Sequence, residues 1–215
     1  MGQSDTKQYY LQDSRGNVGE NLMFWAPAGA GYTSNIDNAA LFSEEAAFTQ
    51  HESRHCDVPW PAEYVRARVR PVVDMQYISH AEAMAMHTNE SEFYLQRPGQ
   101  WEGNDIIFVP SAGKKGTSDL RKARIVTQDE LARDPDLQYL GVVWPRAYLD
   151  AKSRLAADAT RCSIDEALAP TGRVLVPVPK PKPERFRCHG CGVFVSIGNY
   201  YSCAGCPRCG ADNRP

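Results

Sequence analysis

The sequence lacks the features that would place it quickly in several classes of protein. No hydrophobic run in its 215 residues approaches the roughly 18 residues of a membrane helix. The first ten residues, MGQSDTKQYY, have no apolar middle of the kind found in secretory signals. There is no Gly-rich phosphate loop and no Ser/His/Asp arrangement that indicates nucleophilic catalysis. We therefore expect a cytoplasmic protein that has no membrane partner and is not an enzyme.

A strong overall charge is also missing, because the formal net charge is -2. The charges are nevertheless uneven along the chain. Residues 1–92 hold 6 basic and 13 acidic side chains (net -7), residues 93–174 hold 12 and 11 (net +1), and residues 175–215 hold 6 and 2 (net +4). An acidic front and a basic end indicate different partners for the two ends of the chain. A solvated acidic surface without any partner would give the same pattern.

The sequence repeats itself with an offset of 84 residues. Residues 9–74 align with residues 93–158 without a gap, and 17 of the 66 pairs are identical. Chance similarity between two amphipathic stretches rarely gives an ungapped match of this length, so we predict an internal duplication. The identical pairs include Tyr10-Leu11-Gln12 with Tyr94-Leu95-Gln96, Gly19 with Gly103, Phe24 with Phe108, Trp60-Pro61 with Trp144-Pro145, Tyr64 with Tyr148, and Arg70 with Arg154.

Both copies predict the same elements. Each begins with a short strand, and a second, apolar strand follows a turn that contains glycine. Helices are expected after Ser43 and Thr127, where a capping hydroxyl precedes acidic residues, and after each Trp-Pro pair. The stretch SHAEAMAMHTNESE, residues 79–92, is rich in Ala, Met and Glu and predicts a helix that links the copies.

The stretch GYTSNIDNAALFSEEA resembles a short module of uncharacterised phage and prophage proteins. The resemblance covers roughly a quarter of the chain, and the second copy departs from it because Gly31-Tyr32 becomes Lys115-Gly116. It implies a viral or mobile-element origin and carries no known catalytic residues. Together with the acidic front of the chain, which could mimic nucleic acid, it leads us to expect a host protein complex as the partner and a role as a counter-defence inhibitor. The matching residues are Gly31, Tyr32, Thr33, Ala39, Phe42, Ser43, Glu44 and Glu45.

The stretch HESRH, residues 51–55, fits the HExxH pattern of zinc peptidases. His51 and His55 would bind the metal from one helical face, and Glu52 would polarise a water molecule. Arg54 argues against this alternative, because a guanidinium beside a dication is unfavourable. Candidate third ligands lie in no recognisable motif, and the other copy lacks the pattern. The candidates are Glu63, His80, Glu82 and His87, and the matching residues in the other copy are Pro135, Asp136 and Tyr139.

Cysteine is scarce until the C-terminus, where five of the seven cysteines fall within 22 residues. Two Cys-x-x-Cys-Gly turns there resemble the knuckles of a zinc ribbon, in which four thiolates surround the metal and each glycine lets the loop close. We expect one structural Zn²⁺ per chain, held by Cys188, Cys191, Cys206 and Cys209. Cys203 could replace Cys206 as a ligand, and a redox role for the pairs is a further alternative.

A Pro-rich basic segment, RVLVPVPKPKPERFR, precedes these cysteines and predicts a stiff extended spacer. Basic side chains beside Phe186, Phe194, Tyr200 and Tyr201 are suited to phosphates and stacked bases. DNA or RNA binding through residues 175–215 is therefore the alternative to a protein partner. Between the turns, Val193, Val195 and Ile197 predict one strand of a hairpin and Tyr200-Tyr201 the returning strand.

The predicted fold class is α+β, with two tandem small antiparallel-sheet-plus-helix modules followed by a C-terminal zinc ribbon. The Trp and Tyr of the two Trp-Pro-x-x-Tyr motifs are expected to pack in a core or between the modules. The predicted boundaries are residues 1–84 for the first module, 85–173 for the second, 174–186 for the linker and 187–215 for the ribbon.

Overall fold

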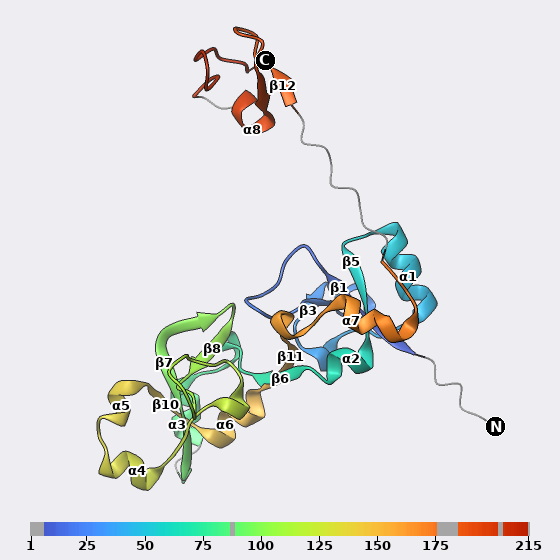
Figure 1. Ribbon diagram of the computed structural model, residues 1–215. Helices are drawn as coiled ribbons and strands as arrows, with labels where there is room; N and C mark the ends of the chain where they lie inside the picture. Colours follow the sequence, from blue (N-terminus) through green and yellow to red (C-terminus); the bar gives the residue numbers. More distant parts are fainter. Residues whose placement is uncertain (1–6, 87–88, 176–184, 202–203, 215) are drawn as a thin grey trace, which may run out of the picture. The chain divides into compact units, whose positions relative to one another are not determined.

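The computed structural model describes residues 7–86, 89–175, 185–201 and 204–214. It divides into two compact units, Met1–Val174 and Leu175–Pro215 (Figure 1). The described elements are short helices and several small antiparallel sheets, which confirms the α+β class. The prolines of the predicted spacer, at positions 177, 179, 181 and 183, lie outside the described residues. No described helix is long and apolar enough to cross a membrane.

The first copy of the repeat forms a sheet around strand β1 (Gln8–Asp13), whose side chains are almost all buried. Helix α1 (Glu44–Ser53) starts as predicted, because Ser43 Oγ accepts a hydrogen bond from the Ala46 amide at 3.2 Å. The remaining elements of this copy are β2 (Phe24–Trp25), β3 (Tyr32–Thr33), β4 (Phe42–Ser43), β5 (Asp57–Pro61), α2 (Ala62–Arg66) and the 3-10 turns η1 (Pro27–Gly29) and η2 (Ile36–Asn38).

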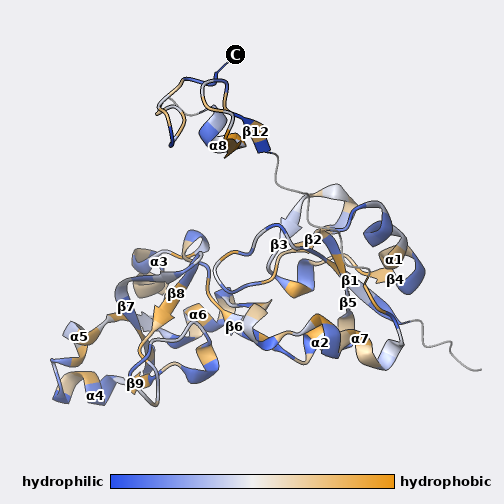
Figure 2. Ribbon diagram, turned by 45° about the horizontal axis from the view of Figure 1, so that its top comes forward, coloured by the Kyte–Doolittle hydropathy of each residue, from blue (hydrophilic) through white to orange (hydrophobic). Residues whose placement is uncertain are grey.

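The second copy forms a matching sheet around β7 (Glu92–Glu102). Its strand register repeats that of the first copy at the same offset: Gln12 lies opposite Phe24, and Gln96 opposite Phe108. Thr127 and Glu130 form the predicted capping box. The remaining elements are β8 (Asp105–Phe108), η4 (Leu120–Lys122), β9 (Ile125–Thr127), α4 (Gln128–Arg133), α5 (Leu137–Leu140), β10 (Val142–Pro145) and α6 (Arg146–Lys152). In Figure 2, β8 is coloured hydrophobic, whereas α1 is largely hydrophilic.

The two copies are related by a local twofold axis. Strands β6 (Val69–Val72) and β11 (Arg154–Ala157) pair antiparallel, and Pro71 lies opposite Leu155, its own counterpart in the repeat. Contacts near the axis occur in symmetric pairs. The Leu22 amide donates to the Ala157 carbonyl at 2.9 Å, as the Ile106 amide does to the Val73 carbonyl at 3.0 Å. The copies are thus arranged like the subunits of a symmetric dimer within one chain.

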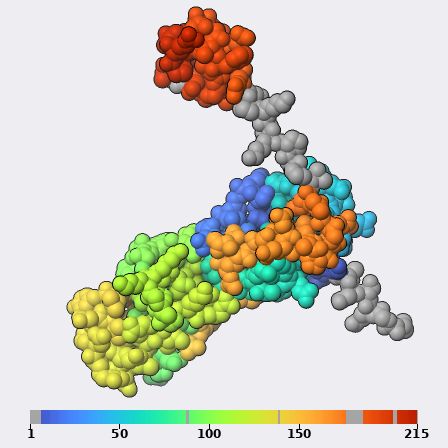
Figure 3. Space-filling view, in the orientation of Figure 1, coloured from blue at the N-terminus to red at the C-terminus, as the bar shows by residue number. Residues whose placement is uncertain are grey.

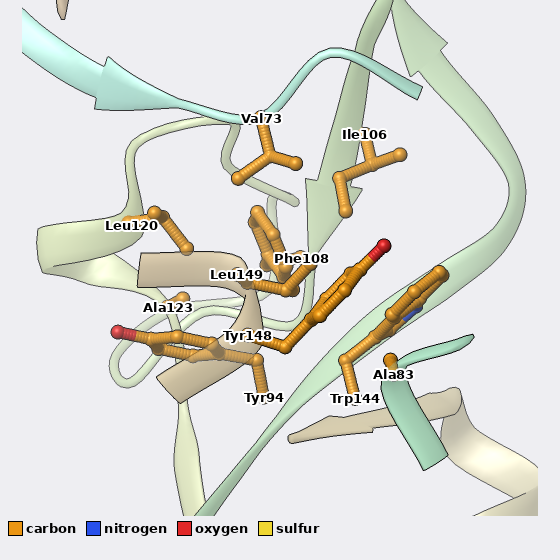
Figure 4. Packing of buried hydrophobic residues seen from close by; sticks show 10 residues of the cluster. All are labelled: Val73, Ala83, Tyr94, Ile106, Phe108, Leu120, Ala123, Trp144, Tyr148 and Leu149. Atoms are coloured by element: carbon orange, nitrogen blue, oxygen red, sulfur yellow. The ribbon is translucent and has the colours of Figure 1, made fainter. Parts of the chain in front are cut away.

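Each copy contributes its last segment to the core of the other copy. The core around Tyr94 and Trp144 contains Val73 and Ala83 from the first copy (Figure 4). The core around Tyr10 and Trp60 contains Ala157 and Ala167 from the second. The exchanged elements are η3 (Met75–Tyr77) and α3 (His80–Met86) in one direction, and η5 (Ala159–Arg161), α7 (Ile164–Leu168) and η6 (Ala169–Thr171) in the other. In Figure 3, the orange surface of η5, α7 and η6 lies against the blue and cyan surface of the first copy.

The exchange is reinforced by a symmetric pair of tyrosine contacts. Tyr64 donates to Glu166 at 3.1 Å and accepts from the Ser163 amide at 3.0 Å. Tyr148 makes the matching bonds to Glu82 (3.1 Å) and Ser79 (2.9 Å). Helix α3 is therefore more than the expected link between copies, because it is part of the second core. Neither core consists of one continuous segment of the chain.

Two glycines meet back to back near the axis, and they give a sharp test of the symmetric packing. Gly19 and Gly103 have φ values of 62° and 61°, and an added Cβ would lie 2.7 Å and 2.6 Å from backbone atoms of the opposite loop. We expect Gly19→Ala to lower the free energy of unfolding by about 3 kcal/mol, from left-handed strain plus the clash. The measurement is chemical denaturation of the first unit.

Gly99→Ala is the matched control for this test. Gly99 has a φ of 66°, but nothing lies within 4 Å of an added Cβ. The free energy of unfolding of Gly99→Ala should fall only by the cost of the left-handed conformation, about 1 kcal/mol. An equal decrease in the free energy of unfolding for Gly19→Ala and Gly99→Ala would contradict the close approach of the two loops.

The C-terminal unit contains a small sheet of β12 (Arg185–Arg187) and β13 (Phe194–Ser196) and a helical turn, α8 (Ile197–Tyr200). The prediction that Tyr200-Tyr201 forms the returning strand is wrong. Ser196 Oγ accepts from the Asn199 amide at 3.3 Å and caps α8, so the chain turns into a helix there. The partner of β13 is instead the segment that precedes the first cysteine.

Candidate metal centre

The two Cys-x-x-Cys-Gly turns fold in the same way. The Gly192 amide donates to the Cys188 carbonyl at 2.9 Å, and the Gly210 amide donates to the Cys206 carbonyl at 2.8 Å. Both glycines are left-handed, with φ of 66° and 74°. A residue with a side chain is strained in this conformation, which explains why glycine follows each pair.

Each turn also points backbone N–H groups at its first sulfur. The Gly190 amide lies 3.3 Å from Cys188 Sγ, and the Arg208 amide lies 3.4 Å from Cys206 Sγ. Amide donors stabilise a thiolate relative to a thiol. Both turns are therefore shaped to present negatively charged sulfur.

The four sulfur atoms form a compact cluster. All four lie within 4.8 Å of one another; Cys188 Sγ is 3.6 Å from Cys209 Sγ, and Cys191 Sγ is 3.8 Å from Cys206 Sγ. Zinc–sulfur bonds of about 2.3 Å in a tetrahedron place the sulfurs about 3.8 Å apart. A disulfide would require a separation of about 2.05 Å. The spacing therefore fits a four-coordinate metal ion and does not fit disulfide bonds.

The pKa values of Cys188 and Cys209 are shifted in opposite directions. Burial raises the pKa of Cys188, but the amides of Cys191 and Gly190 outweigh it and lower that pKa to about 6. The Ala211 amide lowers the pKa of Cys209, but the neighbouring sulfurs, led by Cys191, and burial raise it to about 12. A divalent cation at the centre would offset the repulsion among four thiolates.

Neighbouring residues bury part of the cluster and hold its two turns together. Cys188 and Cys206 are buried together with Val195. Asn213 is fully buried; its Oδ1 accepts from the His189 amide at 2.9 Å and its Nδ2 donates to the Ala211 carbonyl at 3.2 Å. Asn213 thus ties the two turns together. The sequence gives no motif for this residue, and only its position three residues after Gly210, the end of the second turn, connects it with the site.

Cys56 and Cys162 do not join this cluster. Cys162 belongs to the first unit, where burial raises its pKa. Cys56 accepts a hydrogen bond from Arg54 Nε at 3.2 Å. Cys203, the alternative ligand, lies outside the described residues, so its exchange with Cys206 stays a prediction.

The HESRH stretch does not form one helical face. Helix α1 ends at Ser53, so His55 lies beyond it. His51 is buried, its Nδ1 lies 2.9 Å from the Asp57 carbonyl oxygen, and its ring centroid is 5.4 Å from that of His55. Among the described residues, only the four cysteines form a group of three or more side chains placed to share a metal ion. Of the candidate third ligands, His87 is not described.

Comparisons with protein-family models, with curated proteins and with solved structures found no match. The resemblance to phage proteins therefore has no support beyond the sequence.

Proposed function

We propose that this chain is a non-enzymatic binding protein whose C-terminal ribbon is folded around one structural Zn²⁺ ion. The observation that carries the proposal is the set of four cysteine sulfurs at the spacing of a tetrahedral zinc site. Four protein thiolates fill the coordination shell, so the ion has no open position for a substrate or a water molecule. Its role is to stabilise a segment too small to bury a sufficient core of its own.

The ribbon would serve as a docking surface for a macromolecular partner. Phe194, Ile197 and Tyr201 are exposed on it, and the Arg187 guanidinium lies 4.5 Å from the centroid of the Phe194 ring. Exposed aromatic side chains beside arginine are typical of residues that anchor protein interfaces. A host protein complex is the partner that we propose, with inhibition of a host defence as the outcome; the acidic charge of residues 1–92 and the sequence resemblance support this part.

A nucleic-acid partner is the second candidate for the same surface. Arg185 and Arg187 lie on β12, beside the aromatic side chains of Phe186 and Phe194. Basic and aromatic side chains in alternation suit a single strand, whose phosphates and bases they would contact together. Such binding would weaken steeply with added salt, because it releases counterions from the phosphates.

A partner-capture experiment with a surface variant tests the docking role. Tagged protein would be compared with the variant Phe194→Ser/Tyr201→Ser, which removes two exposed side chains and none of the cysteines. We expect the partner to be retained by the parent protein and reduced at least tenfold with the variant, at equal zinc content. Equal capture by the two proteins would contradict docking through the ribbon. Retention of DNA or RNA in place of a protein would select the second candidate.

A further inference from the structure

The internal repeat provides a built-in comparison, because each residue of one copy has a counterpart at the same structural position in the other. The first unit contains a cavity of about 890 Å³ next to the hairpin of β7 and β8. The corresponding hollow of the first copy, beside Asp13 and Tyr32, measures about 440 Å³. Ligand pockets of drug-sized molecules occupy about 300–1,000 Å³. The two hollows therefore differ about twofold in volume, and the larger one lies near the upper end of this range.

The divergence between the copies replaces neutral and acidic residues by basic ones. Five basic side chains line the large cavity, and four of them, Arg97, Lys115, Lys122 and Arg161, have no basic counterpart in the first copy. The cavity is also lined by four carboxylates, Glu20, Glu102, Asp119 and Asp158. The counterparts of the four basic residues in the repeat are Asp13, Gly31, Asn38 and Tyr77. The four positions thus carry four positive charges in the second copy and a single negative charge in the first, and of the four counterparts only Asp13 lines the smaller hollow.

Among the described residues, these cations form no close ion pairs, although the charge of Lys122 acts on Asp119 and helps to lower its pKa. Within the described part of the chain, Lys115, Lys122 and Arg161 form no ion pair and no side-chain hydrogen bond, and Arg97 donates only to the Lys114 carbonyl. Like charges around one cavity repel one another unless an anion lies between them. Of the carboxylates in the lining, Glu102 and Asp158 are paired with Arg70, and the basic side chains without such a pair favour an anionic ligand.

One substitution opens the cavity. In the first copy, Tyr32 occupies the hollow; its hydroxyl accepts hydrogen bonds from Arg15 (3.1 Å) and Arg54 (3.2 Å). The counterpart is Gly116, where an added Cβ would collide with the side chain of Ile107. A tyrosine at this position would fill the space in which the basic side chains converge. The absence of a side chain at Gly116 is thus needed both for the local packing and for access to the cavity.

The same cavity offers a ring surface and hydrogen-bond acceptors. Trp101 lines it and is 46% exposed, in a part of β7 that extends past a register shift. Arg70, 4% exposed, donates to Glu102 Oε1 at 2.9 Å, and Ser118 donates to Glu102 Oε2 at 2.6 Å. Glu20 lies close by, since the charge of Glu102 raises the pKa of Glu20. The counterparts of Trp101 and Glu102 are Asn17 and Val18.

The geometry points to a binding site for a free nucleotide in this cavity. Its phosphates would lie among Lys115, Lys122 and Arg161, and its base would stack on Trp101. Amino or hydroxyl groups of the base or ribose would donate to Glu20 and Glu102. The site lies in the first unit and contains no residue of the ribbon, so this inference is independent of the proposed docking role.

Isothermal titration calorimetry on the full zinc-loaded protein tests this inference. The probes are ATP, GTP, CTP and UTP, with inorganic triphosphate as the ligand that lacks a ring. We expect at least one nucleotide to bind with one site per chain and at least tenfold more tightly than triphosphate. Lys115→Glu/Lys122→Glu should weaken that binding at least tenfold, and Trp101→Ala at least fivefold, with unchanged circular dichroism.

Asn38→Glu is the matched control, because it places the same new charge at the counterpart of Lys122. It should leave nucleotide affinity unchanged. The inference is overturned if no nucleotide binds at millimolar concentration, if the double variant binds as well as the parent, or if only single-stranded oligonucleotides bind. Loss of zinc through Cys188→Ser/Cys209→Ser should not affect nucleotide binding, which separates this site from the ribbon.

Discussion

The Cys188→Ser/Cys209→Ser variant should lose the fold of its C-terminal unit while the first unit stays intact. Each substitution removes one sulfur from a different turn of the cluster. Binding of structural zinc contributes on the order of 10 kcal/mol to the folding of such small segments. In the described hydrophobic cluster there, Val195 is the only buried side chain besides two cysteines, and Phe186, Val193, Tyr200 and Ala211 are only partly buried. Amide resonances of the ribbon should therefore collapse to unfolded positions in the NMR spectrum.

Resonances of the first unit provide the internal control in the same spectrum. The two units form separate compact bodies along the chain, so the first unit should keep its dispersed peaks and its melting temperature. Ala204→Ser, a change inside the ribbon that leaves all four cysteines in place, controls for substitution in this segment. A ribbon that stays folded in the double cysteine variant would show that packing, and not the metal, holds it together.

A fragment of residues 1–84 should not form a stable folded monomer. In the intact chain its Val73 and Ala83 lie in the core of the second copy, while its own core takes Ala157 and Ala167 in return. The fragment also leaves the buried Arg70 without Asp158 and Glu102, and an unpaired buried charge costs several kcal/mol. We expect the monomer of this fragment to be unfolded.

Self-association offers the fragment a way to recover its contacts. Because the axis relates equivalent residues, a second copy of the fragment could supply Val73 and Ala83 to the vacated positions. Sedimentation should therefore show a dimer at high concentration and an unfolded chain on dilution. The matched control is the fragment of residues 1–174, which contains both copies and should be a folded monomer. A folded monomer of residues 1–84 would contradict the exchange.

The duplication and most of the secondary structure could be predicted from the sequence, because both depend on local pattern. The offset of 84 carries over to the strand register, from Gln12 opposite Phe24 to Gln96 opposite Phe108. The exchange could not be predicted. Val73 and Ala157 are apolar in either core, and hydrophobic pattern does not say which of two equivalent cores a segment will join. Only the pairing of β6 with β11 decides this.

The candidate metal site could be predicted from the sequence in the greatest detail, because each Cys-x-x-Cys-Gly turn specifies its own geometry. The prediction of a returning strand at Tyr200-Tyr201 was wrong, because the alternation of Val193, Val195 and Ile197 does not indicate that Ser196 caps a helical turn. The large cavity could be predicted from the sequence only in part. The change from Gly31-Tyr32 to Lys115-Gly116 can be read from the aligned copies, but the convergence with Arg161, from the exchanged segment, required the fold.

Zinc content per chain is the most direct test of the account. It would be measured by inductively coupled plasma mass spectrometry on the purified whole protein and on Cys188→Ser/Cys209→Ser. The account predicts one zinc ion per chain in the first and none in the second. No zinc in the whole protein would contradict the structural metal site. Two ions in the whole protein and one in the variant would place a second metal outside the ribbon, and His51, Glu52 and His55 would be the first residues to test. This result would contradict a non-enzymatic role based on a single closed site.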